Sequence, residues 1–347
     1  MDAYRVLAEK LEYGDSGRLR KLLEFLMTPK QAEIATCLPA PFEEVANKVG
    51  LTVDGVRNEI NDLFSKGVVI PKDFRTLEGA RFARSLLQLH DATEADRRTE
   101  EIYEERAPQL WGLWEDFSQK EWYARVADEY AKKEVPPNRV IPAYKAIQNV
   151  SDISPYDDVR EILKAAPLIA AVPCSCRRQN RRTDIAVNTC MQFGRSAEYA
   201  IARDSGWQLS YEEALKVIDE AEECGEVHEW INWRTLSYGV MCNCDNQACE
   251  LWVPLIQYDV SIGKRWAKSR FEAVVDQELC NGCQVCVDRC QFDAIEMIKP
   301  AGSKKYKAVV DPEKCWGCGV CVTKCEPASL SLKLVRGLEH IPAERPA

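Results

Sequence analysis

The chain has 347 residues, enough for two or three domains that each bury a core of their own. Its formal net charge of −9 argues against general affinity for nucleic acid, because binding to a phosphate backbone depends on positive charge that displaces counterions. It contains 16 cysteines, and we recognise neither a signal peptide nor an apolar run long enough to span a bilayer. We therefore expect a cytoplasmic protein, not inserted in a membrane, whose thiols stay reduced and bind metal.

Residues 1–90 are predicted to form a mainly helical domain with a winged-helix-like core. A capping box at residues 28–31, with Pro at the first helical position, begins a helix that runs to Leu38. The next helix ends at Gly50, and Thr52 caps a following helix that has one apolar face. This pair of helices resembles the helix-turn-helix of DNA-binding regulators.

The charges of residues 38–70 favour a protein-docking or scaffolding role for this domain. The segment contains three basic and five acidic side chains. A helix that reads the major groove is expected to present Arg, Lys, Asn or Gln among few acidic residues. We therefore expect no nucleic-acid partner, and DNA binding is kept as the alternative.

Residues 91–157 are predicted to form charged helices followed by an extended connector. The helical part, up to residue 134, carries the aromatic side chains Trp111, Trp114, Phe117, Trp122 and Tyr123. We interpret this group as packing within its own protein, with a partner-binding face as the alternative. Prolines from residue 136 onward end the helix, and we expect an extended segment over the surface as far as residue 157.

Residues 158–270 are predicted to form a small mixed α/β domain rich in cysteine. Capping residues and the spacing of apolar side chains indicate its main elements. The expected helices are residues 159–166 and 211–224, and the expected strands are residues 168–172, 227–231 and 236–241.

Two of these strands are each followed by a Cys-x-Cys pair. The pairs are Cys174 with Cys176 and Cys242 with Cys244, and Cys190 lies between them in the sequence. If the two strands are neighbours that run the same way, both pairs emerge at one edge of the sheet and four thiolates converge. We expect a pair to offer both sulfurs to one metal only where the chain turns.

We predict a third [4Fe-4S] cluster at this group of cysteines. Its expected ligands are Cys174, Cys176, Cys190 and either Cys242 or Cys244, with Cys249 held in reserve. A structural zinc ion and unligated core cysteines are the alternatives.

Arg177 and Arg178 directly follow the first pair and are candidates for tuning this cluster. Positive charge near an iron–sulfur cluster favours the reduced state and so raises the reduction potential. The alternative is a solvated face whose arginines pair with local acidic residues.

Residues 271–335 contain two copies of Cys-x2-Cys-x2-Cys-x3-Cys, followed by a tail at residues 336–347. Three thiolates of each copy can wrap one [4Fe-4S] cluster, while the fourth cysteine points at the other cluster. Cluster one is therefore predicted to take Cys280, Cys283, Cys286 and Cys325, and cluster two to take Cys315, Cys318, Cys321 and Cys290. Zinc knuckles are the alternative.

This segment resembles the bacterial-type two-cluster ferredoxin domain, which implies a ferredoxin-like fold around two [4Fe-4S] clusters. It departs from that family at Gln291, which follows Cys290 where the family usually has Pro. Between the two copies, a turn at residues 299–303 separates the apolar stretches 294–298 and 306–310, so we expect a β-hairpin.

A wider resemblance covers nearly the whole chain. The motifs PYDDVREIL, PCSCR, CMQFG, YEEAL, GEVHEW and CNC occur in this order. They are similar to those of a group of cytoplasmic iron–sulfur proteins of anaerobic bacteria and archaea, in which such a unit precedes a two-cluster ferredoxin domain. The resemblance implies electron transfer beside larger oxidoreductases. Relatives commonly have further cysteines after CNC, where this chain has residues 245–248 before Cys249.

We find no Gly-x-Gly-x-x-Gly loop, Walker loop, His-Glu-x-x-His motif or nucleophile elbow in the sequence. The chain is therefore predicted to be an α+β, multidomain electron-transfer subunit rather than an enzyme in its own right. It would relay single electrons between a redox donor and a catalytic partner, with larger flavin- or metal-containing subunits as partners. The alternatives are a redox-sensing transcriptional regulator and an oxidoreductase whose third cluster is open to substrate.

Overall fold

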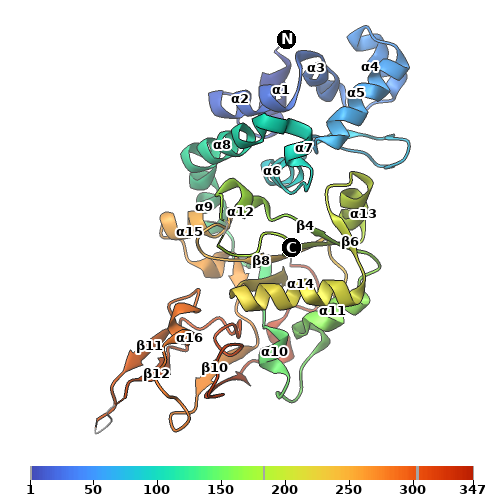
Figure 1. Ribbon diagram of the computed structural model, residues 1–347. Helices are drawn as coiled ribbons and strands as arrows, with labels where there is room; N and C mark the ends of the chain where they lie inside the picture. The colour runs from blue at the N-terminus through green and yellow to red at the C-terminus, as the bar shows by residue number, and fades with distance from the viewer. Residues whose placement is uncertain (1, 183, 302–304, 347) are drawn as a thin grey trace. The chain divides into compact units, whose positions relative to one another are not determined.

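The computed structural model describes residues 2–182, 184–301 and 305–346, which fall into two compact units (Figure 1). Unit 1 consists of Met1–Tyr123, Val172–Thr183 and Glu198–Trp207, and unit 2 of Ala124–Ala171, Asp184–Ala197 and Gln208–Ala347. Unit 1 is mainly helical, whereas unit 2 combines helices with most of the strands, so the chain has α+β content. Among the described residues, no helix is both long enough and apolar enough to cross a membrane.

Five helices and a short strand pair make up the first part of unit 1. They are α1 (Ala3–Lys10), α2 (Gly17–Leu26), α3 (Pro29–Cys37), α4 (Phe42–Val49) and α5 (Val53–Ser65), followed by the antiparallel strands β1 (Val69–Ile70) and β2 (Arg81–Phe82). Thr28 Oγ1 accepts the Gln31 backbone N–H at 3.2 Å, and Gln31 Oε1 accepts the Thr28 N–H at 2.9 Å. Gly50 ends α4 in the left-handed region, and Thr52 caps α5. These predicted helix ends are confirmed.

The aromatic residues of the next helices form a core inside unit 1. The elements are α6 (Leu86–Glu94), α7 (Thr99–Tyr103), α8 (Ala107–Phe117) and a π-helical turn at Ser118–Trp122. Trp114 is fully buried, and its indole N–H donates to Thr93 Oγ1 at 3.1 Å. The other buried aromatic side chains of this segment are Phe117, Trp122 and Tyr123. Their predicted packing within the protein is confirmed, while Trp111 stays partly exposed.

A seven-stranded sheet forms the centre of unit 2, in the order β6-β4-β5-β8-β7-β3-β9. The strands are β3 (Asn138–Ile141), β4 (Ile169–Val172), β5 (Cys190–Phe193), β6 (Trp207–Leu209), β7 (Val227–Ile231), β8 (Val240–Cys244) and β9 (Trp266–Ala267). Strand β8 pairs antiparallel with β5 and with β7. Strand β3 pairs antiparallel with β7 and parallel with β9.

The expectation of an extended surface connector up to residue 157 is wrong at β3. Val140 and Ile141 are buried, and the strand lies between β7 and β9 in the sheet. Pro137 and Pro142 flank this four-residue strand, of which only Val140 and Ile141 are apolar. Proline cannot donate a hydrogen bond to a neighbouring strand, so prolines on both sides indicated a connector. The short strand between them was therefore not predicted.

The two faces of the sheet have different neighbours. Helices α11 (Val159–Ala165) and α14 (Tyr211–Cys224) share one core with Met191, Phe193, Trp230 and Met241 of the sheet. The other core contains Val140, Val227, Cys244, Cys249, Trp252 and Trp266. Side chains alternate between faces along a strand, so Met241 and Cys244 belong to opposite cores. The predicted ends of α14 are confirmed, with the Ser210 capping box before it and Gly225 in the left-handed region after it.

The last part of unit 2 contains two small antiparallel sheets. Strand β10 (Phe271–Val275) pairs with β13 (Leu330–Leu334), and β11 (Ile295–Ile298) pairs with β12 (Lys307–Val310). The hairpin predicted between the two cysteine motifs is therefore confirmed, and part of its predicted turn, residues 302 and 303, lies outside the described residues.

The remaining helices of the two units are α9 (Tyr123–Ala131), α10 (Tyr144–Ile147), α12 (Ser175–Gln179), α13 (Arg195–Ala202), α15 (Val253–Gln257) and α16 (Val285–Asp288).

Candidate metal centres

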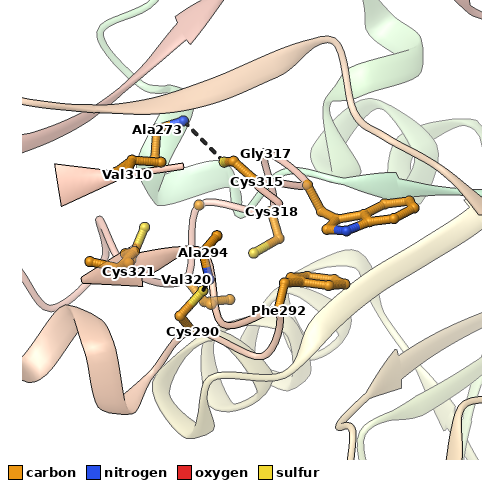
Figure 2. Close-up of a pocket in the computed structure, with 13 residues that line it drawn as sticks. Ala273, Cys290, Phe292, Ala294, Val310, Cys315, Gly317, Cys318, Val320 and Cys321 are labelled. Carbon is orange, nitrogen blue, oxygen red and sulfur yellow. Dashed lines mark hydrogen bonds between the residues drawn. The ribbon is translucent and has the colours of Figure 1, made fainter. Parts of the chain in front are cut away.

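The first candidate centre is a cavity surrounded by Cys290, Cys315, Cys318 and Cys321 (Figure 2). The empty space among the lining residues, part of it open to solvent, is about 320 Å³, and Phe292 also lines it. Three of these thiols come from the second motif copy and one from the first, which is the combination that the sequence predicts for cluster two.

The second candidate centre is a cavity lined by the remaining motif cysteines, Cys280, Cys283, Cys286 and Cys325, with about 300 Å³ of empty space that is partly open to solvent. This is the set predicted for cluster one. Cys280 and Cys286 are buried, Cys325 is partly buried and Cys283 is exposed. In the first cavity Cys315, Cys318 and Cys321 are buried and Cys290 is partly buried, so its thiols are better shielded than those of the second cavity, which reaches the surface at Cys283.

A glycine between the first two cysteines of each motif lets the backbone fold tightly around each cavity. Gly282 has a φ of 80°, and a Cβ atom there would lie 2.4 Å from the carbonyl oxygen of Tyr306. Gly317 has a φ of 65°, and a Cβ atom would lie 2.1 Å from the carbonyl oxygen of Phe271. Only glycine fits both the left-handed backbone and the close approach.

Backbone N–H groups point at the thiol sulfurs of both cavities. Ala273 N–H donates to Cys315 Sγ at 3.4 Å and Ala294 N–H to Cys290 Sγ at 3.3 Å. Ala308 N–H donates to Cys280 Sγ at 3.5 Å. Such donors stabilise thiolate charge, and hydrogen bonds to sulfur are among the factors that set the potential of a cluster.

Burial raises the pKa of several of these thiols in the absence of metal. The pKa of Cys286 rises to about 11 and that of Cys318 to about 12, in each case chiefly through desolvation. Neutral thiols grouped in fours around a cavity are suited to bind metal as thiolates, with release of their protons. The two sets therefore fit two [4Fe-4S] clusters, with four thiols for each.

Strand β8 brings Cys242 and Cys244 to one face of the central sheet. The two residues are two positions apart in an extended strand, and side chains at such positions share a face. The expectation that a Cys-x-Cys pair needs a turn is therefore wrong here. The strand also begins later than predicted, because Thr235 Oγ1 donates to Ser237 O and accepts the Ser237 N–H in the preceding loop.

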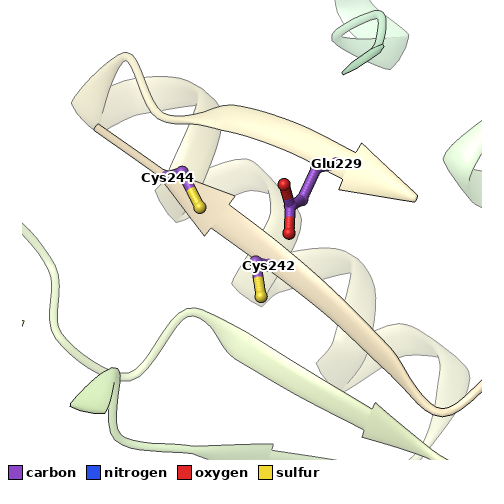
Figure 3. A group of neighbouring side chains, drawn as sticks. All are labelled: Glu229, Cys242 and Cys244. Atoms are coloured by element: carbon purple, nitrogen blue, oxygen red, sulfur yellow. The ribbon is translucent and has the colours of Figure 1, made fainter. Parts of the chain in front are cut away.

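Glu229 and Cys190 flank Cys242 on the two neighbouring strands. Glu229 is the register partner of Cys242 on β7. On β5, Met191 pairs with Met241, and extending this register by one residue places Cys190 opposite Cys242. Directly opposite residues of antiparallel strands have Cβ atoms about 4.5–5.5 Å apart. The ligand atoms of Glu229, Cys242 and Cys244 all lie within 4.8 Å of one another (Figure 3).

Cys249, in the loop after β8, also reaches this group. Hydrogen bonds with Cys242 and with Cys249, together with burial, raise the pKa of the Cys244 thiol well above its ordinary range. Asp245 Oδ1 shapes the intervening turn by accepting the Ala248 N–H at 2.9 Å. The structure thus brings Cys242, Cys244 and Cys249 together in unit 2, and the sheet register adds Cys190.

A buried ion pair beside these thiols was not predicted from the sequence. Arg265 Nη2 donates to both carboxylate oxygens of Glu229, at 2.8 and 2.7 Å, and the Trp266 indole N–H also donates to Glu229. Burial raises the pKa of the Glu229 carboxyl to about 8, and the Arg265 guanidinium opposes this rise. Since its oxygens already have three donors, Glu229 is better suited to be a hydrogen-bonded neighbour of the thiols than a ligand. The signal available in the sequence was an acidic residue, Glu229, inside the predicted strand 227–231.

Cys174 and Cys176 lie in unit 1, at the start of α12. The condition set for convergence of the two Cys-x-Cys pairs is not met, because β5 lies between β4 and β8 in the sheet. The strands that precede the two pairs are therefore not neighbours, and the first pair opens a helix while the second lies within a strand.

Arg178 has a local acidic partner within unit 1. Its Nη2 donates to Glu100 Oε2 at 2.9 Å, and its guanidinium lies over the Trp111 ring, 5.3 Å from the ring centroid. Arg177 is buried on the same short helix. The acidic partner of Arg178 is what the alternative interpretation expects, but the solvated face is not, because Arg177 is buried and the Arg178 side chain is only 10% exposed. A role of these arginines in tuning a cluster stays a prediction.

Comparison with known proteins identifies the C-terminal part. A family model described as a 4Fe-4S dicluster domain matches residues 242–328, which include both motif copies and begin at Cys242. No curated protein and no solved structure gives a significant match to the chain. The dicluster match supports an iron–sulfur electron-transfer role with at least two [4Fe-4S] clusters.

Proposed function

We propose that this protein is an iron–sulfur electron-transfer subunit that relays single electrons between a redox donor and a catalytic partner in a cytoplasmic oxidoreductase complex. The observation that carries the proposal is the pair of cavities, each bounded by four cysteines, within the dicluster match. Bound [4Fe-4S] clusters supply reversible one-electron chemistry. The chain's own residues hold the clusters and shield them, and its backbone N–H groups stabilise the charge on the sulfurs.

The ligand sets are part of the proposal. Cys280, Cys283, Cys286 and Cys325 would hold cluster one, and Cys290, Cys315, Cys318 and Cys321 would hold cluster two. The lining of the two cavities supports this crossed arrangement, because each contains the fourth cysteine of the other motif copy.

A third [4Fe-4S] cluster is proposed at the cysteine group of β8. Cys190, Cys242, Cys244 and Cys249 are its best-supported ligands, since the register and the thiol hydrogen bonds gather them within unit 2. Cys174 and Cys176, with Arg177 and Arg178 as tuning residues, stay predictions from the sequence. A set of four thiols would leave no iron open to substrate, which favours electron relay over catalysis at this position.

The winged-helix interpretation of α3 to α5 is kept as a proposal, with a protein partner rather than DNA. The basic side chains of the segment are engaged within unit 1. Lys48 pairs with Glu44 at 2.7 Å and Lys66 with Asp62 at 2.6 Å. Arg57 donates to the Thr76 carbonyl oxygen at 2.9 Å. These contacts do not favour the redox-sensing regulator.

An anaerobic reductive titration, followed by electron paramagnetic resonance, tests the relay. We expect stepwise, reversible one-electron uptake that assigns one electron to each cluster. Purification from the native source under anaerobic conditions should recover a larger flavin- or metal-containing subunit with the protein. Clusters that cannot be reduced and reoxidised reversibly would contradict the proposed function.

A further inference from the structure

The loop after β8 is joined to the turn after Cys290 by two hydrogen bonds. The Asn246 backbone N–H donates to Gln291 Oε1 at 3.2 Å, and Asn246 Nδ2 donates to the Gln291 carbonyl oxygen at 3.0 Å. Asn246 lies between Cys244 and Cys249, and Gln291 directly follows Cys290. Gln291 stands where the two-cluster ferredoxins usually have Pro. It supplies a side-chain acceptor that Pro lacks.

Both residues that flank Cys290 are attached to the C-terminal end of α14. Arg289 Nη2 donates to the Glu222 carbonyl oxygen at 2.6 Å, and Arg289 Nη1 donates to that of Glu223 at 2.9 Å. Gln291 Nε2 donates to the Gly225 carbonyl oxygen at 3.2 Å. These contacts hold the Cys290 ligand of cluster two against the domain that carries the β8 thiols.

A continuous aromatic core fills the space between the two cysteine groups. The Trp252 and Phe292 ring centroids are 5.1 Å apart, and the Phe292 and Trp316 rings stack at 5.4 Å. This core also contains Cys244 and Cys249 of the β8 group and Cys318 of the cluster-two set. Trp316 follows the ligand Cys315, and the backbone N–H of Trp252 donates to the Cys249 carbonyl oxygen at 2.9 Å. Side chains of both thiol sets therefore belong to one hydrophobic core.

Cluster one has a different environment. The aromatic core around Trp252, as far as the structure describes it, contains no cysteine of the cluster-one set. Cys283 is exposed, and so is Val285, which lines the same cavity. The cluster-one site thus reaches the surface at Cys283, whereas each cysteine of the cluster-two set is buried or partly buried.

We propose that Trp252, Phe292 and Trp316, fastened by the Asn246–Gln291 contact, form the electron route between the β8 thiol site and cluster two, and that cluster one lies outside this step. The inference rests on the proposed third cluster. The step moves one electron from the reduced centre to the oxidised one, with no bond made or broken and no proton required. The order of the three centres would be cluster one, cluster two, β8 site.

Magnetic interaction between the centres tests this order in the full-length protein. A paramagnetic cluster speeds the spin relaxation of its nearest paramagnetic neighbour. We would measure microwave power saturation of the β8-site signal in the reduced wild-type protein and in three variants. Cys318→Ser and Cys290→Ser each remove a cluster-two ligand. Cys283→Ser removes a cluster-one ligand. We expect the relaxation enhancement to be lost in both cluster-two variants and kept in Cys283→Ser. Should Cys318→Ser fail to fold, Cys290→Ser provides the same test.

A second measurement addresses the route itself. In Phe292→Leu all thiols remain, so all clusters should assemble, and we expect slower electron equilibration between cluster two and the β8 site after rapid reduction. Gln277→Ala, which removes a hydrogen-bonding glutamine elsewhere in the dicluster domain, is the matched control and should leave this rate unchanged. If the relaxation enhancement of the β8-site signal were lost in Cys283→Ser but kept in Cys290→Ser, the proposed order would be wrong. The proposed third cluster would still stand. A wild-type protein that lacks a third iron–sulfur signal would instead overturn the proposed third cluster, and this order with it.

Discussion

Arg265 and Glu229 form a two-contact ion pair in the interior of unit 2, with side chains only 3% and 5% exposed. Glu229 lies on β7 directly opposite Cys242, and Arg265 Nη2 donates to both oxygens of its carboxylate. The pair therefore places a guanidinium and a carboxyl group, bonded to each other, beside the proposed third cluster. Neither charge is stable there without the other, because an unpaired ion in a buried setting lacks solvation.

Breaking this pair should destabilise the protein strongly. Arg265→Met leaves Glu229 buried and unpaired, so we expect the free energy of unfolding of unit 2 to fall by about 3–5 kcal/mol. Denaturant unfolding of the metal-free protein measures the change. The double variant Arg265→Met/Glu229→Gln should recover most of the loss, because it removes both charges. A double variant as unstable as Arg265→Met would show that the lost packing of Arg265, and not the unpaired charge, causes the effect.

Trp114 is expected to be a core residue of unit 1. It is fully buried and hydrogen-bonded to Thr93, whereas Trp111, three residues earlier, is partly exposed. Trp114→Ala should lower the free energy of unfolding by about 3–5 kcal/mol, the usual cost of removing a buried large aromatic side chain. Trp111→Ala is the matched control and should cost clearly less. Equal losses in thermal or denaturant unfolding would contradict this assignment.

The N-terminal helices are expected not to bind DNA. The basic residues of α4 and α5 already pair within unit 1, and the acidic residues around them repel phosphates. A gel shift with random duplex at low salt, where a true DNA reader should still bind non-specifically, should show no complex. Binding that depends on the state of the clusters would instead support the redox-sensing regulator.

The crossed ligand sets predict which variants resemble one another. Cys325→Ser should damage the same cluster as Cys283→Ser, although Cys325 belongs to the second motif copy, because both thiols line one cavity. Paramagnetic resonance spectra of the two reduced variants should show the same remaining cluster signals. If Cys325→Ser matched Cys318→Ser instead, each motif would hold its own cluster and the crossing would be wrong.

Local signals predicted the elements that depend on local interactions. The ends of α3, α4 and α14 follow from capping residues and glycines in the left-handed region, and these are readable in the sequence. The hairpin of β11 and β12 follows from two apolar stretches around a turn.

Strand order and the surroundings of the third site could not be predicted in the same way. That β5 separates β4 from β8 is a long-range pairing, which no nearby residue specifies. The partner of Glu229, Arg265, lies 36 residues away in the sequence. Gln291 was recognised as a departure from the ferredoxin pattern, but its partner Asn246 lies 45 residues away and became visible only in the structure.

Metal content of the anaerobically purified protein tests the central claim most directly. Three [4Fe-4S] clusters predict about twelve irons and twelve acid-labile sulfides per chain, with no zinc. The same analysis of Cys242→Ser/Cys244→Ser should return about eight irons, because only the third cluster loses its ligands. A wild-type protein with about eight irons and one zinc would contradict the account, since a structural zinc ion at the β8 thiols cannot carry electrons.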